Sequence, residues 1–220
     1  MSDTQLIPGD IGQLEIILDT PAGWRQSDLI TICCHPHPLH GGSMQNKVVH
    51  ILAKSFLQLG SKVVRFNFRG VGQSEGKFDN GIGEQADLLA VVQWCRQNWP
   101  DAPSGLAGFS LGAFVAAMAH EKIAPQRLVL VAPPVDMYPD MISVQIKTRD
   151  WILIQGGQDE IVASQSVEDW ATQQAISPKK LFFAEAGHFF HGKLNLIKEG
   201  IVDTWGKIHG IVGAVSDRDI

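Results

Sequence analysis

The sequence predicts an α/β fold with a mostly parallel, twisted sheet and helices on both faces. Short runs rich in β-branched or aromatic residues alternate with longer segments in which apolar residues recur at helical spacing. This alternation is typical of parallel sheets, because each crossover between parallel strands needs a long connection, usually a helix. The chain has 220 residues, 45% of them hydrophobic, which is enough for one core of ordinary size. We therefore expect a single domain over residues 1–220, with 211–220 as a candidate loose tail.

Six runs have the length and composition of buried strands. They are 29–34, 62–68, 105–109, 127–131, 151–154 and 181–183. Residues 13–18 differ from these runs, since apolar and polar side chains alternate there before Pro21 and Gly23. Such alternation is typical of a strand with one solvated face. We expect 13–18 to form an antiparallel edge strand or one arm of a hairpin.

Helices are expected in the segments between these strands. Residues 44–59 place Val49, Leu52 and Phe56 on one face of a helix. Further helices are expected over 82–99, over the small residues of 113–119, and over 194–209. Each of these helices would cover part of one face of the sheet.

Charge and cysteine content narrow the class of protein. The net charge of −5 disfavours nucleic acid and anionic membranes as partners, because both require clustered Lys and Arg. No run approaches the roughly 18 apolar residues of a membrane span, and the first residues lack the pattern of a secretory signal. Three cysteines, with Cys33 and Cys34 adjacent, cannot staple a domain of this size. We therefore expect a reducing, cytoplasmic location.

The strongest local signal is the pentapeptide Gly108-Phe109-Ser110-Leu111-Gly112, which lies between an apolar run and a helix of small residues. This context is typical of a nucleophile elbow, in which a serine on a sharp turn exposes its hydroxyl. Glycines on both sides are expected to remove side chains that would collide across the turn. The start of the following helix would bring free N–H groups and a positive dipole end close to an oxyanion. The pattern predicts Ser110 as a nucleophile.

A candidate acid follows in the chain order that this elbow requires. Asp159 lies in the loop that leaves the predicted strand 151–154, where functional residues of open α/β sheets gather. Asp159 could instead cap the following helix, although Ser164 or Ser166 could serve equally well there. Glu160 is the second candidate for the acid. We predict that Asp159 is the acid of the site.

A candidate base follows the last predicted strand. His188 comes after the strand 181–183 and directly after Gly187, so it could reach over the edge of the sheet toward Ser110. His191 is the competing histidine, and it is expected to lie a turn later, inside the final helix. We predict that His188 is the base.

Together these motifs resemble the α/β-hydrolase superfamily. Gly-x-Ser-x-Gly is followed by Gly-x-x-Asp and then by Gly-His-Phe-Phe-His. An early strand also leads into a loop that reads Cys34-His35-Pro36-His37-Pro38-Leu39-His40-Gly41-Gly42-Ser43-Met44. This loop is similar to the marker of a group of small serine hydrolases with little or no cap domain, and the resemblance extends to about residue 209.

The resemblance implies an α/β-hydrolase fold with a catalytic triad. Ser110 would be the nucleophile, Asp159 the acid and His188 the base. It also implies an oxyanion hole made by backbone N–H groups of Leu111 and of the histidine-rich loop. In that loop we place the second donor at His37, with Leu39 as the alternative, because the intervening prolines have no N–H.

The histidine-rich loop also raises the question of a metal site. His35, His37 and His40 could supply imidazole ligands for zinc. However, two prolines interrupt the run, and no carboxylate or cysteine evidently completes a ligand set. We expect no metal, and no other cofactor.

A glycine-rich loop at 69–74 resembles a dinucleotide fingerprint. The third glycine of that pattern would fall at position 75, where the chain has Glu75. No nucleotide site is therefore expected. The resemblance to the hydrolases implies that Arg69 in this loop has a structural role.

The segment 132–150 is short, and in hydrolases with a lid this segment carries the lid. It has room for a loop and one short helix, so we expect no substantial lid. The cleft should then be shallow and open, and should accept short acyl chains.

The expected function is hydrolysis of carboxylic esters, thioesters included, by a serine hydrolase acting on a small-molecule substrate. A peptidase or amide hydrolase is the nearest alternative, since the same triad cleaves amides if the leaving amine is protonated well. A non-catalytic binding protein is a third possibility, because fold does not determine function. The complete set of triad residues disfavours it. The sequence leaves the natural substrate open, and also whether the protein is a monomer or a homodimer.

Overall fold

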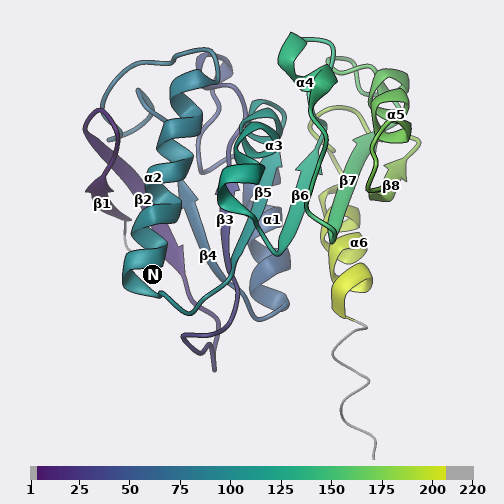
Figure 1. The fold of residues 1–220 in the computed structure, drawn as a ribbon. Coiled ribbons are helices and arrows are strands. Elements are labelled where there is room, and N and C mark those ends of the chain that lie inside the picture. Colours follow the sequence, from purple (N-terminus) through teal and green to yellow (C-terminus); the bar gives the residue numbers. More distant parts are fainter. Residues whose placement is uncertain (1–3, 207–220) are drawn as a thin grey trace, which may run out of the picture.

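The computed structural model describes residues 4–206, whose strands form one twisted sheet in the order β1-β2-β4-β3-β5-β6-β7-β8 (Figure 1). The strands are β1 (Thr4–Pro8), β2 (Gln13–Asp19), β3 (Ile30–Cys34), β4 (Lys62–Phe66), β5 (Ser104–Phe109), β6 (Arg127–Val131), β7 (Trp151–Gly156) and β8 (Lys179–Phe183). Strands β3 to β8 run parallel, whereas β1 and β2 are antiparallel to their neighbours. The predicted mostly parallel sheet is confirmed.

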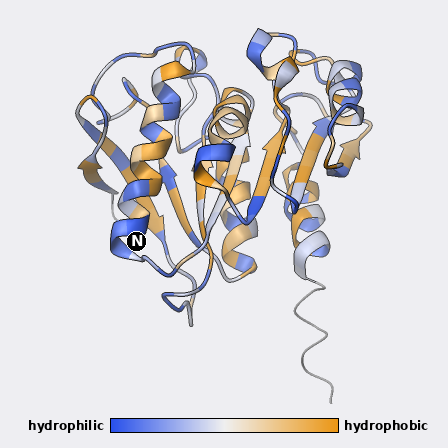
Figure 2. Cartoon of the chain, viewed as in Figure 1, coloured by the Kyte–Doolittle hydropathy of each residue, from blue (hydrophilic) through white to orange (hydrophobic). Residues whose placement is uncertain are grey.

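Helices cover both faces of this sheet. They are α1 (Lys47–Gln58), α2 (Ile82–Asn98), α3 (Leu111–Ile123), α4 (Pro139–Ser143), α5 (Ser164–Thr172) and α6 (Leu194–Gly206), with a 3-10 turn η1 (Pro38–His40). Helices α1 and α6 bury their apolar residues in a core on one face, and α2, α3 and α5 bury theirs on the other. Figure 2 shows the sheet as mostly hydrophobic and the outer surfaces of the helices as more hydrophilic. This arrangement is what a sheet buried on both faces requires.

The N-terminal hairpin differs in part from the prediction. Strand β2 is an arm of a hairpin, and its partner β1 was not predicted. The missing signal has a physical cause, since Ile7 is the one buried residue of β1 and Leu6 is 43% exposed. A strand that buries so little carries no clear apolar pattern.

The ends of the helices also differ slightly from the prediction. Helix α1 begins at Lys47 because the side chain of Asn46 accepts a hydrogen bond from the N–H of Val48 at 2.9 Å and so caps the helix. Helix α3 is longer than the predicted 113–119. The predicted end of the last helix, 207–209, and the candidate tail 211–220 lie outside the described residues.

The segment between β6 and β7 contains the five-residue helix α4 and no further helix or strand. It is too short to form a lid, as predicted.

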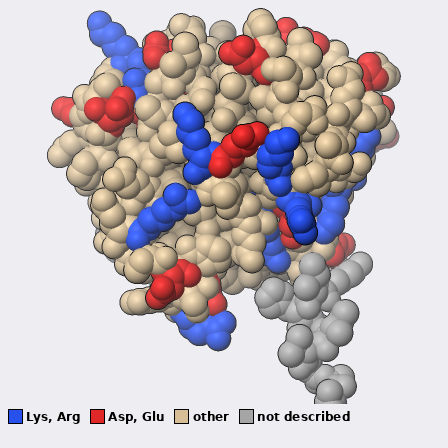
Figure 3. Space-filling model, in the orientation of Figure 1, with Lys and Arg blue, Asp and Glu red and all other residues tan. Residues whose placement is uncertain are grey.

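None of the helices within residues 4–206 is long and apolar enough to cross a membrane. On the face shown in Figure 3, basic and acidic side chains lie next to one another instead of forming a field of one sign.

Candidate active site

Ser110 lies on a sharp turn between β5 and α3. Its backbone has φ 54° and ψ −120°, a strained region for a residue other than glycine, and its N–H donates to the carbonyl of Val131 at 2.9 Å. A Cβ at Gly108 would lie 2.1 Å from the carbonyl oxygen of Gly112, and a Cβ at Gly112 would lie 2.3 Å from that of Cys34. The expected collision across the turn therefore applies to Gly108. Gly112 is required instead by the close approach of the helix to the end of β3.

Asp159 follows β7, and donors surround its carboxylate. The N–H groups of Ile161 and Val162 donate to Oδ1 at 2.9 and 2.7 Å, and Nε2 of Gln155 donates to Oδ2 at 3.1 Å. Nδ1 of His188 lies 2.9 Å from Oδ2. Because an ionised carboxylate can only accept, Nδ1 of the imidazole carries the proton and Nε2 keeps a free lone pair.

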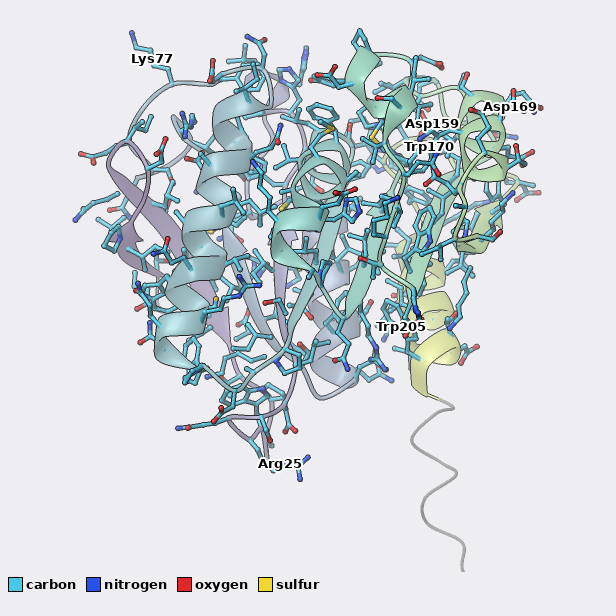
Figure 4. The ribbon with its side chains drawn as sticks, viewed as in Figure 1. Arg25, Lys77, Asp159, Asp169, Trp170 and Trp205 are labelled. Atoms are coloured by element: carbon cyan, nitrogen blue, oxygen red, sulfur yellow. The ribbon has the colours of Figure 1, made fainter. Side chains whose placement is uncertain are left out.

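Asp159 and His188 lie beyond the carboxyl ends of the parallel strands. Figure 4 shows Asp159 at that end of the molecule and Trp205 near the opposite end. Burial raises the pKa of Asp159, but the hydrogen bonds from His188 and from the backbone outweigh it, so the net pKa lies below its ordinary value. Asp159 does not cap α5, because Ala163 is the N-cap residue of that helix. The carboxylate is therefore ionised at neutral pH and buried against the imidazole.

His188 is held from several sides. Its side chain is 2% exposed, and its ring lies 5.0 Å from the ring of Phe109 between centroids. Its backbone N–H donates to Oε2 of Glu160 at 3.2 Å, so the second candidate acid binds the backbone of the histidine and not its ring. His191 is exposed and lies in the turn before α6, not inside that helix as predicted.

Ser110 and His188 line the same pocket, which has a volume of about 240 Å³. His37 and Gly42 of the loop after β3 line it as well, together with Tyr138 from the segment after β6. Loops that follow β3, β5, β6, β7 and β8 thus meet at this edge of the sheet. The pocket is slightly smaller than the roughly 300–1,000 Å³ of typical sites for drug-sized ligands.

The backbone N–H groups of Leu111, the first residue of α3, and of His37 border the pocket and have no hydrogen-bond acceptor among the residues that the structure describes. The same holds for the N–H groups of Tyr138 and Phe189, which lie outside the two segments expected to supply oxyanion donors. The N–H of Leu39 instead donates to Nδ1 of His37 at 3.2 Å, and the Leu39 side chain is 73% exposed. The geometry favours His37 over Leu39 as a donor to a ligand in the pocket.

The three histidines of this loop have different surroundings. Nδ1 of His35 donates to the carbonyl of Pro36 at 2.7 Å, and its Nε2 accepts from the N–H of Phe68 at 3.0 Å, so both nitrogens are used inside the protein. Burial lowers the pKa of His35 to about 4, which keeps the ring neutral. The rings of His37 and His40 lie 4.7 Å apart between centroids. Within residues 4–206, no cluster of three potential metal ligands occurs.

Arg69 has structural contacts. Its guanidinium bonds both carboxylate oxygens of Asp87 on α2, with an Nη2–Oδ1 distance of 2.8 Å, and its own N–H donates to Oδ2 at 2.9 Å. The two side chains are 6% and 0% exposed. This buried pair ties the loop after β4 to α2.

Two buried polar residues that hold the site were missed by the sequence analysis. Oδ1 of Asn67 accepts from the N–H of Met44 at 2.9 Å, which fixes the end of the histidine-rich loop, and its Nδ2 donates to Glu15 at 2.7 Å. Gln155 donates to Asp159 and to the carbonyl of Val162. Each of the two sits within or just after a strand, and this weak signal is shared by many ordinary polar residues.

Comparison with known proteins agrees with this fold. Residues 37–153, just over half of the chain, match the family described as serine aminopeptidase, S33. An uncharacterized protein of Rickettsia prowazekii is 36% identical over 183 residues, which are 79% of this chain and 77% of that protein.

Solved structures give the same result. A member of the α/β serine hydrolases without lid from Xanthomonas campestris is 39% identical, with a TM-score of 0.89 over 94% of each chain. An α/β serine hydrolase homologue from Coxiella burnetii is 43% identical, with a TM-score of 0.87 over 92% of this chain and 97% of that chain. The fold and these relatives thus define an α/β serine hydrolase without a lid. The chain belongs to the family described as serine aminopeptidase, S33.

Proposed function

We propose that the protein hydrolyses carboxylic esters, thioesters included, through an acyl-enzyme on Ser110. The observation that carries this proposal is the buried Asp159–His188 hydrogen bond of 2.9 Å, which lies beside the pocket that Ser110 also lines. A serine hydroxyl is a weak nucleophile until a neighbouring base takes its proton. The tautomer of His188 leaves Nε2 free for that task.

In the proposed mechanism, Ser110 Oγ attacks the carbonyl carbon while His188 Nε2 takes the hydroxyl proton. Asp159 holds the imidazole in this tautomer and stabilises its charged form. The N–H groups of Leu111 and His37 bind the oxyanion, and loss of one such donor typically slows turnover about 100–1,000-fold. His188 then gives its proton to the leaving alcohol or thiol, and water later releases the acid by the same steps.

An aminopeptidase is the second candidate, because the description of the family names that activity. Such an enzyme must bind the substrate's N-terminal ammonium, and a carboxylate in the pocket is the usual partner for that charge. No Asp or Glu is among the described residues that line this pocket. We therefore rank ester hydrolysis first, and comparison of ester with peptide-amide turnover separates the two.

Covalent labelling with a fluorophosphonate probe tests the proposal directly. We expect labelling of the wild type, its abolition in Ser110→Ala and a heavy loss in His188→Ala. Ser143→Ala is the matched control, since Ser143 is exposed on α4 and its hydroxyl bonds the carbonyl of Asp140. Unchanged labelling in Ser110→Ala would refute the assignment, and no labelling of the wild type would favour a non-catalytic binding protein.

The acyl group of the substrate is proposed to be short. The support is the pocket volume of about 240 Å³ and the brief β6–β7 segment. With p-nitrophenyl esters from acetate to palmitate, we expect the highest kcat/KM for the short acids. A preference for palmitate would count against a short acyl site. The cytoplasmic location stays a prediction, which cell fractionation would test.

A further inference from the structure

We propose that Ile161 and Phe189 form a subsite for an apolar, aromatic leaving group. The preferred substrates would then be esters of short acids with aryl-bearing alcohols. This inference rests on the proposed function, because it assigns the alcohol side of the same ester. It goes further by assigning the leaving group and the acyl group to different parts of the pocket lining.

The first observation is the exposure of these two apolar side chains at the site. Ile161 and Phe189 both line the pocket, yet they are 42% and 38% exposed. Their backbones are well held. The N–H of Ile161 donates to Asp159 at 2.9 Å, and Phe189 lies between His188 and the fully buried Phe190. When a ligand covers apolar groups that are already held in place and exposed to solvent, the burial of their surface favours binding.

The second observation is their position next to the imidazole. The ring of Phe189 lies 5.1 Å from that of His188 between centroids, nearly perpendicular to it. In the last step of acylation, the bond between the acyl carbon and the alcohol oxygen breaks. That oxygen receives the proton from Nε2 of His188, so the leaving group must lie on the histidine's side of the pocket. The apolar surface it meets there belongs to Phe189 and Ile161.

Another part of the pocket lining includes a fixed aromatic ring. Tyr138 stacks on Phe114 with ring centroids 4.2 Å apart and an angle of 18° between the planes. Phe114 belongs to the core on the α2 and α3 face, whereas Phe190, next to Phe189, belongs to the core on the α1 and α6 face. Two parts of the pocket lining are thus anchored on opposite faces of the sheet. We assign the leaving group to the part with Phe189, beside His188, and the acyl group to the part with Tyr138 and Met137, whose side chain is 52% exposed.

Two isomeric esters test this division. Benzyl acetate and methyl phenylacetate have the same atoms, but the aromatic ring is on the alcohol in the first and on the acid in the second. Methanol and benzyl alcohol are of similar acidity, so the leaving-group chemistry is closely matched. We expect a higher kcat/KM for benzyl acetate, measured by titration of the released acid at constant pH.

Variants connect this preference to the two residues. Ile161→Ser and Phe189→Ala should each lower kcat/KM for benzyl acetate about tenfold or more, as loss of apolar contact in a pocket does, and leave methyl acetate within about threefold. Leu196→Ala is the matched control, because Leu196 is also 38% exposed but does not line the pocket. It should change neither ester. Phe189→Leu, which keeps an apolar side chain, should restore part of the preference lost in Phe189→Ala.

The possible outcomes separate this inference from the proposed function. An equal loss for benzyl acetate and methyl acetate would mean that Phe189 only orients His188, and would overturn the subsite. A preference of the wild type for methyl phenylacetate over benzyl acetate would also overturn the subsite. If Ser110 is labelled by the fluorophosphonate while either result is found, the serine hydrolase stands and the subsite falls. If Ser110 is not labelled, both fall.

Discussion

Replacing Asp159 by asparagine tests the central contact of the site with little change in shape. In this variant Oδ1 can still accept from the N–H groups of Ile161 and Val162. The new NH₂ group would replace Oδ2, and there it would meet two donors, Nε2 of Gln155 at 3.1 Å and Nδ1 of His188 at 2.9 Å. Two donors cannot bond each other, so both partners must change.

Gln155 and His188 can each remove this donor–donor contact in a different way. The amide of Gln155 can flip, because its Oε1 has no hydrogen-bond partner among the described residues, but the flip gives up the bonds from Nε2 to the carbonyls of Gly156 and Val162. His188 can relieve the conflict by moving its proton from Nδ1 to Nε2. In that tautomer Nε2 no longer accepts the proton of Ser110. We therefore expect kcat to fall about 10,000-fold, which corresponds to about 5 kcal/mol in activation free energy.

The measurement is the kcat of p-nitrophenyl acetate hydrolysis by wild type, Asp159→Asn and a control, Asp169→Asn. Asp169 is an exposed carboxylate on α5, and Figure 4 shows it farther toward the outside of the molecule than Asp159. The control should keep wild-type activity. A kcat within about tenfold of wild type in a folded Asp159→Asn protein would refute the tautomer argument.

Three further predictions concern stability. The pKa of His35, lowered to about 4 by burial, lies below its unfolded value of about 6.5, so stability is present above pH 6.5 and is lost as pH falls toward 4. Urea unfolding at pH 7 and pH 4.5 should show this loss, up to about 3 kcal/mol, and less of it in His35→Gln. Gly112→Ala would place a Cβ 2.3 Å from the carbonyl oxygen of Cys34, so its unfolding free energy should fall by about 3 kcal/mol; a neutral result would contradict the close contact. Asp87→Asn leaves the buried Arg69 with only the longer, 3.4 Å contact to the exposed Asp10 as an ion pair and should cost about 3 kcal/mol in the same assay. A loss below about 1 kcal/mol would mean that the Arg69–Asp87 pair is solvated or that Asp10 replaces Asp87.

Much of the fold could be predicted because strands and helices carry their own periodicity. Five of the six parallel strands are buried almost throughout and were predicted from short apolar runs, since a sheet covered on both faces needs apolar side chains in both directions. The sixth, β8, is only partly buried, and its exposed first two residues, Lys179 and Lys180, were not part of the predicted run 181–183. Strand β1 was missed because it buries little beyond Ile7. The start of α1 was predicted three residues too early, because Asn46 caps the beginning of the helix by a hydrogen bond that periodicity does not reveal.

Residue order and spacing were enough to predict a sharp turn at Ser110 and to single out Asp159 and His188 further along the chain. Glycine at 108 is a local requirement of the sharp turn, whereas glycine at 112 is required by the contact of the helix with Cys34 at the end of β3, which only the tertiary structure shows. For pairs of nearby candidate residues, only the tertiary structure showed which of the two points into the site. The carboxylate of Asp159 reaches the ring of His188 while Glu160 reaches its backbone, and the N–H of His37 stays free while that of Leu39 is bonded. Adjacent residues point in different directions along a loop, and that direction depends on how distant strands place the two ends of the loop, which no short stretch of sequence specifies.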